Sequence, residues 1–231
     1  MHDILDDPTD DDEDHPTPES DPSSTTSRAN HQAFMFGYSS TMLTLRILHP
    51  PNNQIPLYWE LYKENVNPLI RLLHVPTMGK LLMKAAENLD NLSKGTEALV
   101  FAIYLATVTS LTPEQCQSLL QQDKDIAVQR YRFATEQALA RAAFLETQEV
   151  MVLQAFTLFL VSARRHDDSR FVWTMTGLAT RIANALGIHR DGAQFGLSPF
   201  ETEIRRRLWW QVCTLGQSTV MAHLVGMVCS P

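Results

Sequence analysis

The stretch TQEVMVLQAFTLFLVSAR (Thr147–Arg164) constrains the fold more than any other part of the sequence. Val150–Ala163 carries no charged side chain, and apolar residues occur on every side of the helix that it would form. Such a helix has to be buried, because no face of it is suited to water. At 14 residues the uncharged window is shorter than the roughly 18–20 residues that span a membrane. The stretch therefore predicts a helix in the middle of a helical bundle.

The sequence on both sides of this stretch repeats the apolar spacing of helices. No window alternates apolar and polar residues in the way that a half-buried strand would. The fold class that we expect is all-α, a multi-helix bundle of packed antiparallel helices. The further helices predicted are Pro56–Val66, Pro76–Leu89, Lys94–Ser110, a helix that begins at Thr112, Asp123–Leu145, Ser169–Leu186 and a helix that begins at Ser198.

Several helix ends are marked by capping residues. Thr112 precedes a proline and a glutamate, which is typical of a helix start. Ser198 and Glu201 have the spacing of a capping box. Gly187 stands where a left-handed residue would end a helix.

The formal net charge of −7 is unevenly distributed along the chain. Residues 1–30 carry ten acids and one base, whereas the rest of the chain is nearly balanced, which does not favour a nucleic-acid-binding surface on the body. The acidic segment has few large apolar residues to offset the entropy of ordering. We therefore expect residues 1–32 to be a disordered acidic linker. An acidic activation segment is the alternative, although such segments usually contain aromatic residues and none precedes Phe34 here.

The motifs of common enzyme classes do not occur in the sequence, neither a glycine-rich phosphate loop nor a nucleophile elbow. His189-Arg190-Asp191 matches the start of a kinase catalytic loop, but the rest of that motif does not follow, so we interpret the match as chance. His166-Asp167-Asp168 lacks a fourth ligand for a metal, and acids at a helix start explain it more simply. We expect no enzymatic activity and no catalytic, cofactor-binding or metal-binding residue.

Cysteine content and the C-terminal residues bear on where the protein resides. The three cysteines are far apart, which predicts reduced thiols in an intracellular protein, and no apolar signal peptide begins the chain. Leu208–Pro231 contains no Asp, Glu, Lys or Arg, but several polar residues interrupt it. A buried helix end is the favoured interpretation of this window, and a membrane anchor is the alternative.

Residues 171–210 contain a distinctive pattern, with Gly177, Arg181, Gly187, His189 and Arg190 in and just after one predicted helix and Glu203, Arg205, Arg206, Arg207, Trp209 and Trp210 in the next. This pattern resembles the fungal-specific transcription factor domain. This domain is the middle homology or regulatory region of fungal six-cysteine zinc-cluster transcription factors. Similar sequence further upstream, at residues 48–50, 64–69 and 74–77, extends the resemblance to about residues 45–215. We call the eleven residues named above, from Gly177 to Trp210, the signature residues.

We expect the signature residues to serve architecture rather than chemistry. Gly177 would allow a neighbouring helix to approach closely. Arg181 would need a partner if it were buried, and Glu203 is the candidate. Trp209 and Trp210 would fill the groove between neighbouring helices.

The three consecutive arginines of the signature admit two interpretations. Glu201–Arg205 and Glu203–Arg207 have the spacing of acid-to-base pairs on a helix, which predicts a paired helix face. The alternative is that Arg205–Arg207 form a DNA-binding or nuclear-import patch.

Two departures from the family pattern shape the functional expectation. The six-cysteine cluster is absent, so we expect no direct DNA binding by this chain, and zinc only in the missing module. Gly216 stands where the family usually has an aspartate, and residues 216–231 match nothing in the family. We therefore expect a regulatory domain that is truncated at its C-terminus and followed by an unrelated tail.

The resemblance implies a nuclear protein that regulates transcription through contacts rather than catalysis. Such contacts could be intramolecular, with protein partners (co-regulators or a full-length homologue), or with a small effector. A membrane partner is not favoured. The alternative is a helical scaffold without a transcriptional role, with or without C-terminal membrane association.

Overall fold

The computed structural model describes residues 44–166 and 169–228, with side chains of the last helix described as far as residue 217. These residues form helices and turns without a strand, so the predicted all-α class is confirmed. The predicted acidic linker, residues 1–32, lies outside the described residues. The α-helices are α2 (Ile55–Asn65), α3 (Val75–Glu87), α4 (Lys94–Ser110), α5 (Pro113–Gln115), α6 (Lys124–Arg141), α7 (Val150–Ala163), α8 (Ser169–Ala185) and α9 (Pro199–Val228). Shorter turns are η1 (Leu45–Leu48), η2 (Asn52–Gln54), η3 (Leu89–Asn91), the π-helical turn η4 (Cys116–Leu120) and η5 (Gly192–Phe195).

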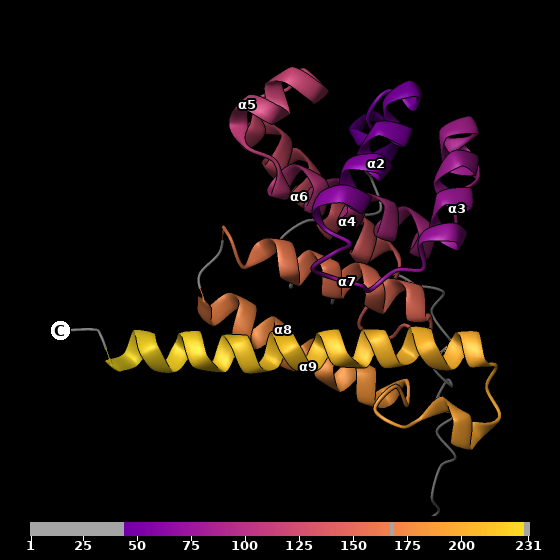
Figure 1. Cartoon of the computed structure of the whole chain (residues 1–231), viewed down its shortest axis with the longest axis vertical. Coiled ribbons are helices and arrows are strands. Elements are labelled where there is room, and N and C mark those ends of the chain that lie inside the picture. Colours follow the sequence, from indigo (N-terminus) through magenta and orange to yellow (C-terminus); the bar gives the residue numbers. More distant parts are fainter. Residues whose placement is uncertain (1–43, 167–168, 229–231) are drawn as a thin grey trace, which may run out of the picture.

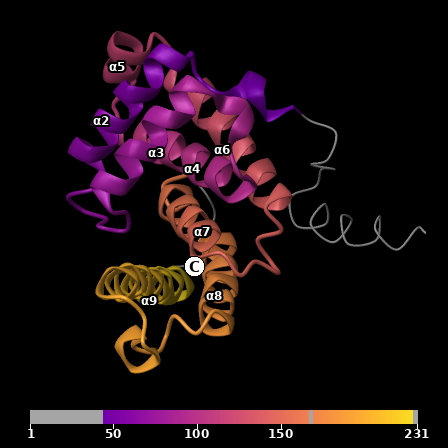
Figure 2. The same ribbon diagram turned by 90° about the vertical axis from the view of Figure 1, so that its right-hand side faces the viewer.

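Helix α7 separates two groups of helices. On one side lie α2, α3, α4 and α6, and on the other side lie α8 and α9 (Figure 1). In Figure 1, α7, α8 and α9 all run from side to side, and Figure 2, which looks along α9, shows α8 and α9 next to each other below α7. The prediction that Thr147–Arg164 lies in the middle of the molecule is therefore confirmed.

The core is built around α4, which contacts α2, α6 and α7. Every residue of α4 from Gly95 to Thr109 is buried except Glu97, which is half-buried. Three small residues of α6, Ala134, Ala138 and Ala140, are also buried, so these two helices can pack closely. The apolar side chains of α4 hold the N-terminal group of helices together, because they are buried against three different helices and so removed from water on all sides.

Three tyrosines meet where α2, α4 and α6 come together. The ring of Tyr104 lies 5.0 Å from that of Tyr58 and 5.5 Å from that of Tyr131. The hydroxyls of Tyr58 and Tyr131 form a buried hydrogen bond of 2.8 Å. Burial raises the pKa of all three phenols, because the charged form would lose its hydration. Tyr62 is also buried with a raised pKa, but among the described residues its hydroxyl has no hydrogen-bond partner.

The predicted helix starts are confirmed by their capping bonds. Thr112 Oγ1 accepts from the backbone N–H of Gln115, whose side chain accepts from the N–H of Thr112 in return. Ser198 Oγ accepts from the N–H of Glu201, whose carboxylate accepts from the N–H of Ser198. These reciprocal bonds satisfy N–H groups that lack partners inside the helix.

One predicted helix is too long. Asp123–Leu145 was expected, but α6 ends at Arg141 because Ala143 takes a left-handed conformation with φ of 50°. The N–H of Phe144 then donates to Leu139 O, and that of Ala143 donates to Ala140 O, which is a Schellman ending. An alanine at this position gives no signal in the sequence.

The C-terminal helix extends beyond the predicted end of the domain. Helix α9 continues without a break from Pro199 to Val228, through the boundary expected at residue 216. Within the described residues, no helix is both long enough and apolar enough to cross a membrane.

The tyrosine cluster predicts opposite effects for two similar substitutions. Tyr58→Phe removes the buried hydrogen bond between the Tyr58 and Tyr131 hydroxyls, so we expect the free energy of unfolding to fall by about 1–2 kcal/mol. Tyr62→Phe removes a buried hydroxyl that has no partner, so we expect no loss or a small gain. Urea denaturation of both variants at neutral pH checks this, and a larger loss in Tyr62→Phe would contradict it.

The raised tyrosine pKa values also predict alkaline unfolding. An unfolded tyrosine ionises near pH 10, whereas the folded protein holds these protons to higher pH. The stabilising contribution is therefore complete below about pH 10 and is lost as the pH rises above it, by up to about 1.4 kcal/mol per pH unit for each buried tyrosine. Denaturation curves between pH 8 and pH 11 measure this, and Tyr62→Phe should make the decline less steep.

Candidate functional site

The corner between α8 and α9 brings together most of the predicted signature residues. Helix α8 ends in a Schellman motif, in which Gly187 has φ of +69° and the N–H of Ile188 donates to Ala183 O. The predicted role of Gly187 is therefore confirmed. Asp191 then caps the short turn η5 by accepting from the N–H of Ala193. The chain enters α9 at the Ser198 capping box.

Arg205 holds the end of α8 rather than pairing with an acid. Its Nη1 donates to Leu186 O at 3.2 Å, one of the carbonyl groups that have no partner inside α8. The predicted Glu201–Arg205 pair is wrong, because the Glu201 carboxylate accepts from the N–H and hydroxyl of Ser198. These bonds lower the pKa of Glu201.

Arg206 joins α9 to the turn before it. Its Nη2 donates to both carboxylate oxygens of Asp191, at 2.7 and 2.9 Å. These hydrogen bonds lower the pKa of Asp191. The sequence does not predict this role of Asp191, because the triplet His189-Arg190-Asp191 is interpreted as a chance match to a kinase motif. The Asp-Gly pair at residues 191–192, typical of a capped turn, is the signal that could have revealed it.

Arg207 forms the predicted helix-face pair. Its Nε donates to Glu203 Oε1 at 2.7 Å, one turn earlier on α9. Each of the three consecutive arginines thus has a partner within the corner. This arrangement favours the paired-face interpretation over a DNA-binding patch.

Two signature residues lie away from these contacts. Gly177 is exposed on α8, and a Cβ added there would meet nothing within 4 Å, so the predicted close approach of a neighbouring helix is wrong. Arg181 is also exposed and needs no buried partner, and Glu203 pairs with Arg207 instead. The residue with a close approach is Gly192, where a Cβ would lie 2.9 Å from Thr202 Oγ1 and 3.3 Å from Thr202 Cα.

The two signature tryptophans have different surroundings. Trp209 is half-buried against the core, and its ring lies 6.2 Å from that of His189. His189 accepts a hydrogen bond from Arg190 Nε, whose guanidinium lies over the ring of Phe195. Trp210 is 72% exposed, so the prediction that it fills a groove between helices is wrong.

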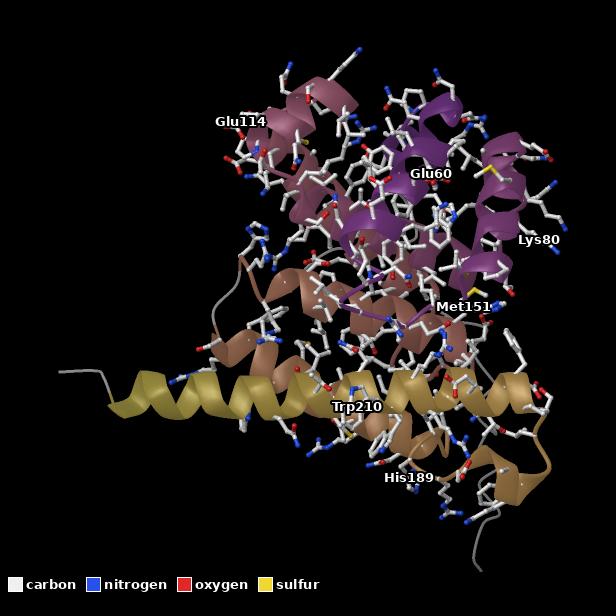
Figure 3. All side chains as sticks on the ribbon, viewed as in Figure 1. Glu60, Lys80, Glu114, Met151, His189 and Trp210 are labelled. Carbon is white, nitrogen blue, oxygen red and sulfur yellow. The ribbon has the colours of Figure 1, made fainter. Side chains whose placement is uncertain are left out.

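Trp210 lies on α9 (Figure 3), and a surface hollow beside it is referred to here as the Trp210 hollow. It has a volume of about 510 Å³ and lies between α9 and the loop that follows α2. Leu69, on the loop side, is 83% exposed. Two large apolar side chains in water next to arginines are typical of a protein-binding surface. Its lining residues are Pro68, Leu69, Arg71, Arg206, Arg207, Trp210 and Gln211.

No group of three or more metal-ligating side chains comes together among the described residues. Asp167 and Asp168, from the alternative metal interpretation, lie outside them. Cys116 is buried and Cys213 half-buried, both as free thiols, and burial raises the pKa of each. Cys229 also lies outside the described residues.

A family model described as the fungal specific transcription factor domain matches residues 57–215. The chain is 43% identical over 157 residues to the aurofusarin cluster transcription factor aurR2 of Gibberella zeae, an alignment covering 68% of this chain and 23% of the relative. It is 36% identical over 179 residues to the pyriculol/pyriculariol biosynthesis cluster transcription factor 1 of Pyricularia oryzae, covering 78% and 24%. It is 32% identical over 188 residues to the C6 finger domain transcription factor adaR of Aspergillus niger, covering 80% and 24%.

The chain thus spans about a quarter of the length of these relatives. No solved structure matches it.

Gly192 in the corner and Gly177 on the exposed face of α8 predict opposite effects of a single added methyl group. Gly192→Ala forces a Cβ against Thr202 and should lower the free energy of unfolding by about 1–3 kcal/mol. Gly177→Ala adds a methyl group in open space within a helix and should raise it by about 0.5–1 kcal/mol. Thermal or urea denaturation compares the two variants. A destabilised Gly177→Ala variant would show that something packs on that face of α8.

Proposed function

This chain belongs to the family of fungal-specific transcription factor domains, and from that premise we propose that it is the regulatory domain of a transcription factor that controls a biosynthetic gene cluster. The observation that carries the proposal is the family match over residues 57–215. Two of the relatives named above are described as regulators of such clusters, for aurofusarin and for pyriculol/pyriculariol.

The contacts of the α8–α9 corner support a role in binding rather than in catalysis. The three arginines satisfy a helix end, a turn and a helix face, so their charges are used to hold the corner together. A rigid corner can present a fixed surface to a partner. The relatives are transcription factors rather than enzymes.

The Trp210 hollow is the surface that we propose contacts a protein partner. Tryptophan and arginine dominate the binding energy of many interfaces, because they bury large areas and donate hydrogen bonds. Trp210 and Leu69 would be covered by an apolar side chain of the partner. Arg71, which is exposed at the rim, suits an acidic residue beside it. A co-regulator or a full-length homologue would fit this description.

In this proposal the domain acts in the nucleus and does not itself bind DNA. The sequence has three cysteines, too few for a six-cysteine cluster. Zinc would therefore belong to a separate module that supplies DNA binding. A small effector that changes how the domain contacts its partner is compatible with the same scheme.

A tethered reporter assay tests the proposed function. The full chain is fused to a heterologous DNA-binding domain in a fungal cell that carries the matching reporter gene. We expect reporter expression to differ from that with the DNA-binding domain alone. We expect Trp210→Ala to reduce this difference by more than half without changing the melting temperature, because the side chain contacts mainly water in the free domain.

Trp173→Ala is the matched control, since Trp173 is 46% exposed on α8 and does not line the Trp210 hollow. It should leave the reporter signal unchanged. Equal reporter expression with and without the chain, together with a fluorescent fusion outside the nucleus, would contradict the proposal and favour the scaffold alternative.

A further inference from the structure

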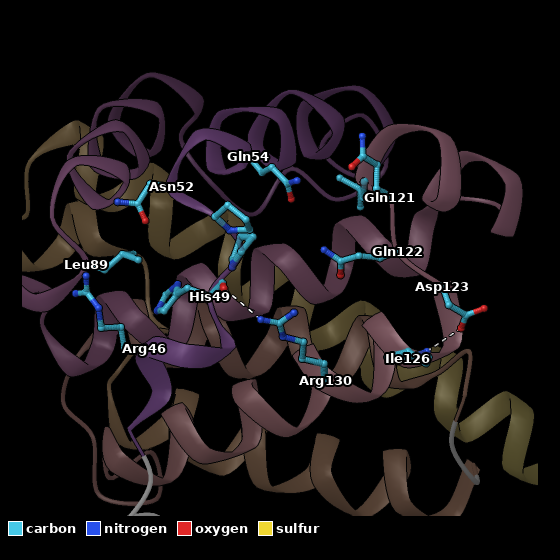
Figure 4. Close-up of a pocket in the computed structure, with 13 residues that line it drawn as sticks. Arg46, His49, Asn52, Gln54, Leu89, Gln121, Gln122, Asp123, Ile126 and Arg130 are labelled. Carbon is cyan, nitrogen blue, oxygen red and sulfur yellow. Dashed lines mark hydrogen bonds between the residues drawn. The ribbon is translucent and has the colours of Figure 1, made fainter.

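A second hollow is lined by residues between 46 and 130, all of them N-terminal to the signature residues. It has a volume of about 700 Å³, within the usual range for small-molecule sites, and we call it the His49 pocket (Figure 4). Its walls come from η1 and η2, from the loop between η4 and α6, and from α6 itself. In Figure 4, Asn52 and Gln54 lie on one side, Gln121–Asp123 on another, and Arg130 points toward His49.

His49 is the strongest sign that this pocket takes a ligand. Its side chain is only 1% exposed, and among the described residues neither ring nitrogen has a hydrogen-bond partner. Its Nε2 is 3.9 Å from Glu97 Oε1, too far for a hydrogen bond. The ring is fixed by contact with Phe101, with centroids 4.2 Å apart. A buried polar group without a hydrogen-bond partner is costly, so a hydrogen-bonding ligand that reaches the ring of this cavity-lining residue would stabilise it.

Gln54 supplies a second buried polar atom that lacks a hydrogen-bond partner. Among the described residues, no group donates to its Oε1. Gln121, across the pocket, adopts a left-handed backbone with φ of 55°, which is strained for a residue with a side chain. Together with Asn52 and Gln122, these side chains offer several amide groups to a ligand.

Arg130 sets the charge that the ligand should carry. Its Nη2 donates to Ile47 O at 3.0 Å and to His49 O at 3.2 Å, so the guanidinium is held in place by neutral carbonyl groups. These bonds position the cation without neutralising it. A carboxylate or an acidic phenol is the group that a guanidinium binds best.

Part of the remaining wall is apolar and suits the body of an organic molecule, and another part comes from Arg46, which pairs with Asp90. The apolar part comes from prolines, leucines and an isoleucine that surround the polar groups, namely Pro50, Pro51, Leu89, Leu120 and Ile126. Apolar walls with a few placed polar groups are typical of small-molecule sites. Asp123, also in the wall, is occupied in capping α6, since it accepts from the N–H groups of Asp125 and Ile126.

We propose that the His49 pocket binds a small organic anion, with an apolar body and a carboxylate or acidic phenol, as an effector of this domain. The acidic group contacts Arg130, and hydrogen-bonding groups of the ligand meet His49 and Gln54. The bound molecule joins η1 and η2 to α6 and so links the segment before α2 to the core. Its regulatory meaning rests on the proposed function, but the binding itself does not.

Binding is measured on the full chain with 2-naphthoate as the probe, by isothermal titration or ligand-observed NMR. The neutral analogue 2-naphthamide has the same shape without the charge. We expect 2-naphthoate to bind at millimolar or lower concentration and at least about tenfold more tightly than the amide, since a charged hydrogen bond is lost in the amide.

Two variants assign the binding to the pocket. Arg130→Gln should weaken 2-naphthoate binding by about tenfold or more, whereas Arg132→Gln, whose wild-type guanidinium pairs with Glu136 outside the pocket, should not. His49→Phe keeps a ring against Phe101 and removes the two nitrogens. This variant should leave the melting temperature unchanged or raise it, and it should still weaken 2-naphthoate binding. It therefore tests whether the ligand binds in the pocket even if Arg130→Gln does not fold.

The proposal is overturned if acid and amide bind equally, if neither binds, or if Arg130→Gln and His49→Phe bind as the wild type does. These outcomes are read without any reporter gene. A domain that binds 2-naphthoate but fails the tethered reporter assay would therefore contradict the proposed function and not the pocket.

Discussion

The whole structure depends on the burial of α4. Its side chains are buried from Gly95 to Thr109 with the exception of Glu97, so other helices must cover it on all sides. Helices α2, α6 and α7 do so, and α7 in turn provides the surface on which α8 and α9 pack. Even Glu97 is accommodated, because Arg141 of α6 lies 3.5 Å from its carboxylate. The position of every later helix thus follows from one helix that cannot contact water.

Much of the fold could be predicted because the relevant interactions are local in sequence. Apolar runs identify the buried helices, and the capping residues Thr112, Ser198 and Gly187 act within a few positions of themselves. The predictions from sequence are wrong where two local conformations or hydrogen bonds compete, or where the hydrogen-bond partner of a residue is distant in sequence. Ala143 ends a helix with a conformation that favours glycine, and Glu201 accepts from its own capping residue instead of meeting the arginine one turn ahead.

The candidate sites were less predictable than the fold. The resemblance places the signature residues on two neighbouring helices, but the pairing of Arg206 with Asp191 spans fifteen positions and depends on how η5 turns. The His49 pocket is assembled from segments between residues 46 and 130, and of its lining residues only His49 and Pro50 lie in a short stretch, residues 48–50, that resembles the family. Exposure was the hardest property to infer, as the opposite surroundings of Trp209 and Trp210 demonstrate.

The bond from Arg205 to Leu186 O has a consequence for how the chain folds. The last turn of α8 is completed by a side chain that lies nineteen positions later and on another helix. The Schellman bonds of Gly187 and Ile188 already close this turn, so the bond from Arg205 adds to its stability only after the first turns of α9 have left the ribosome and docked. Docking of α9 should therefore slow the exchange of the backbone amides at the end of α8 with solvent.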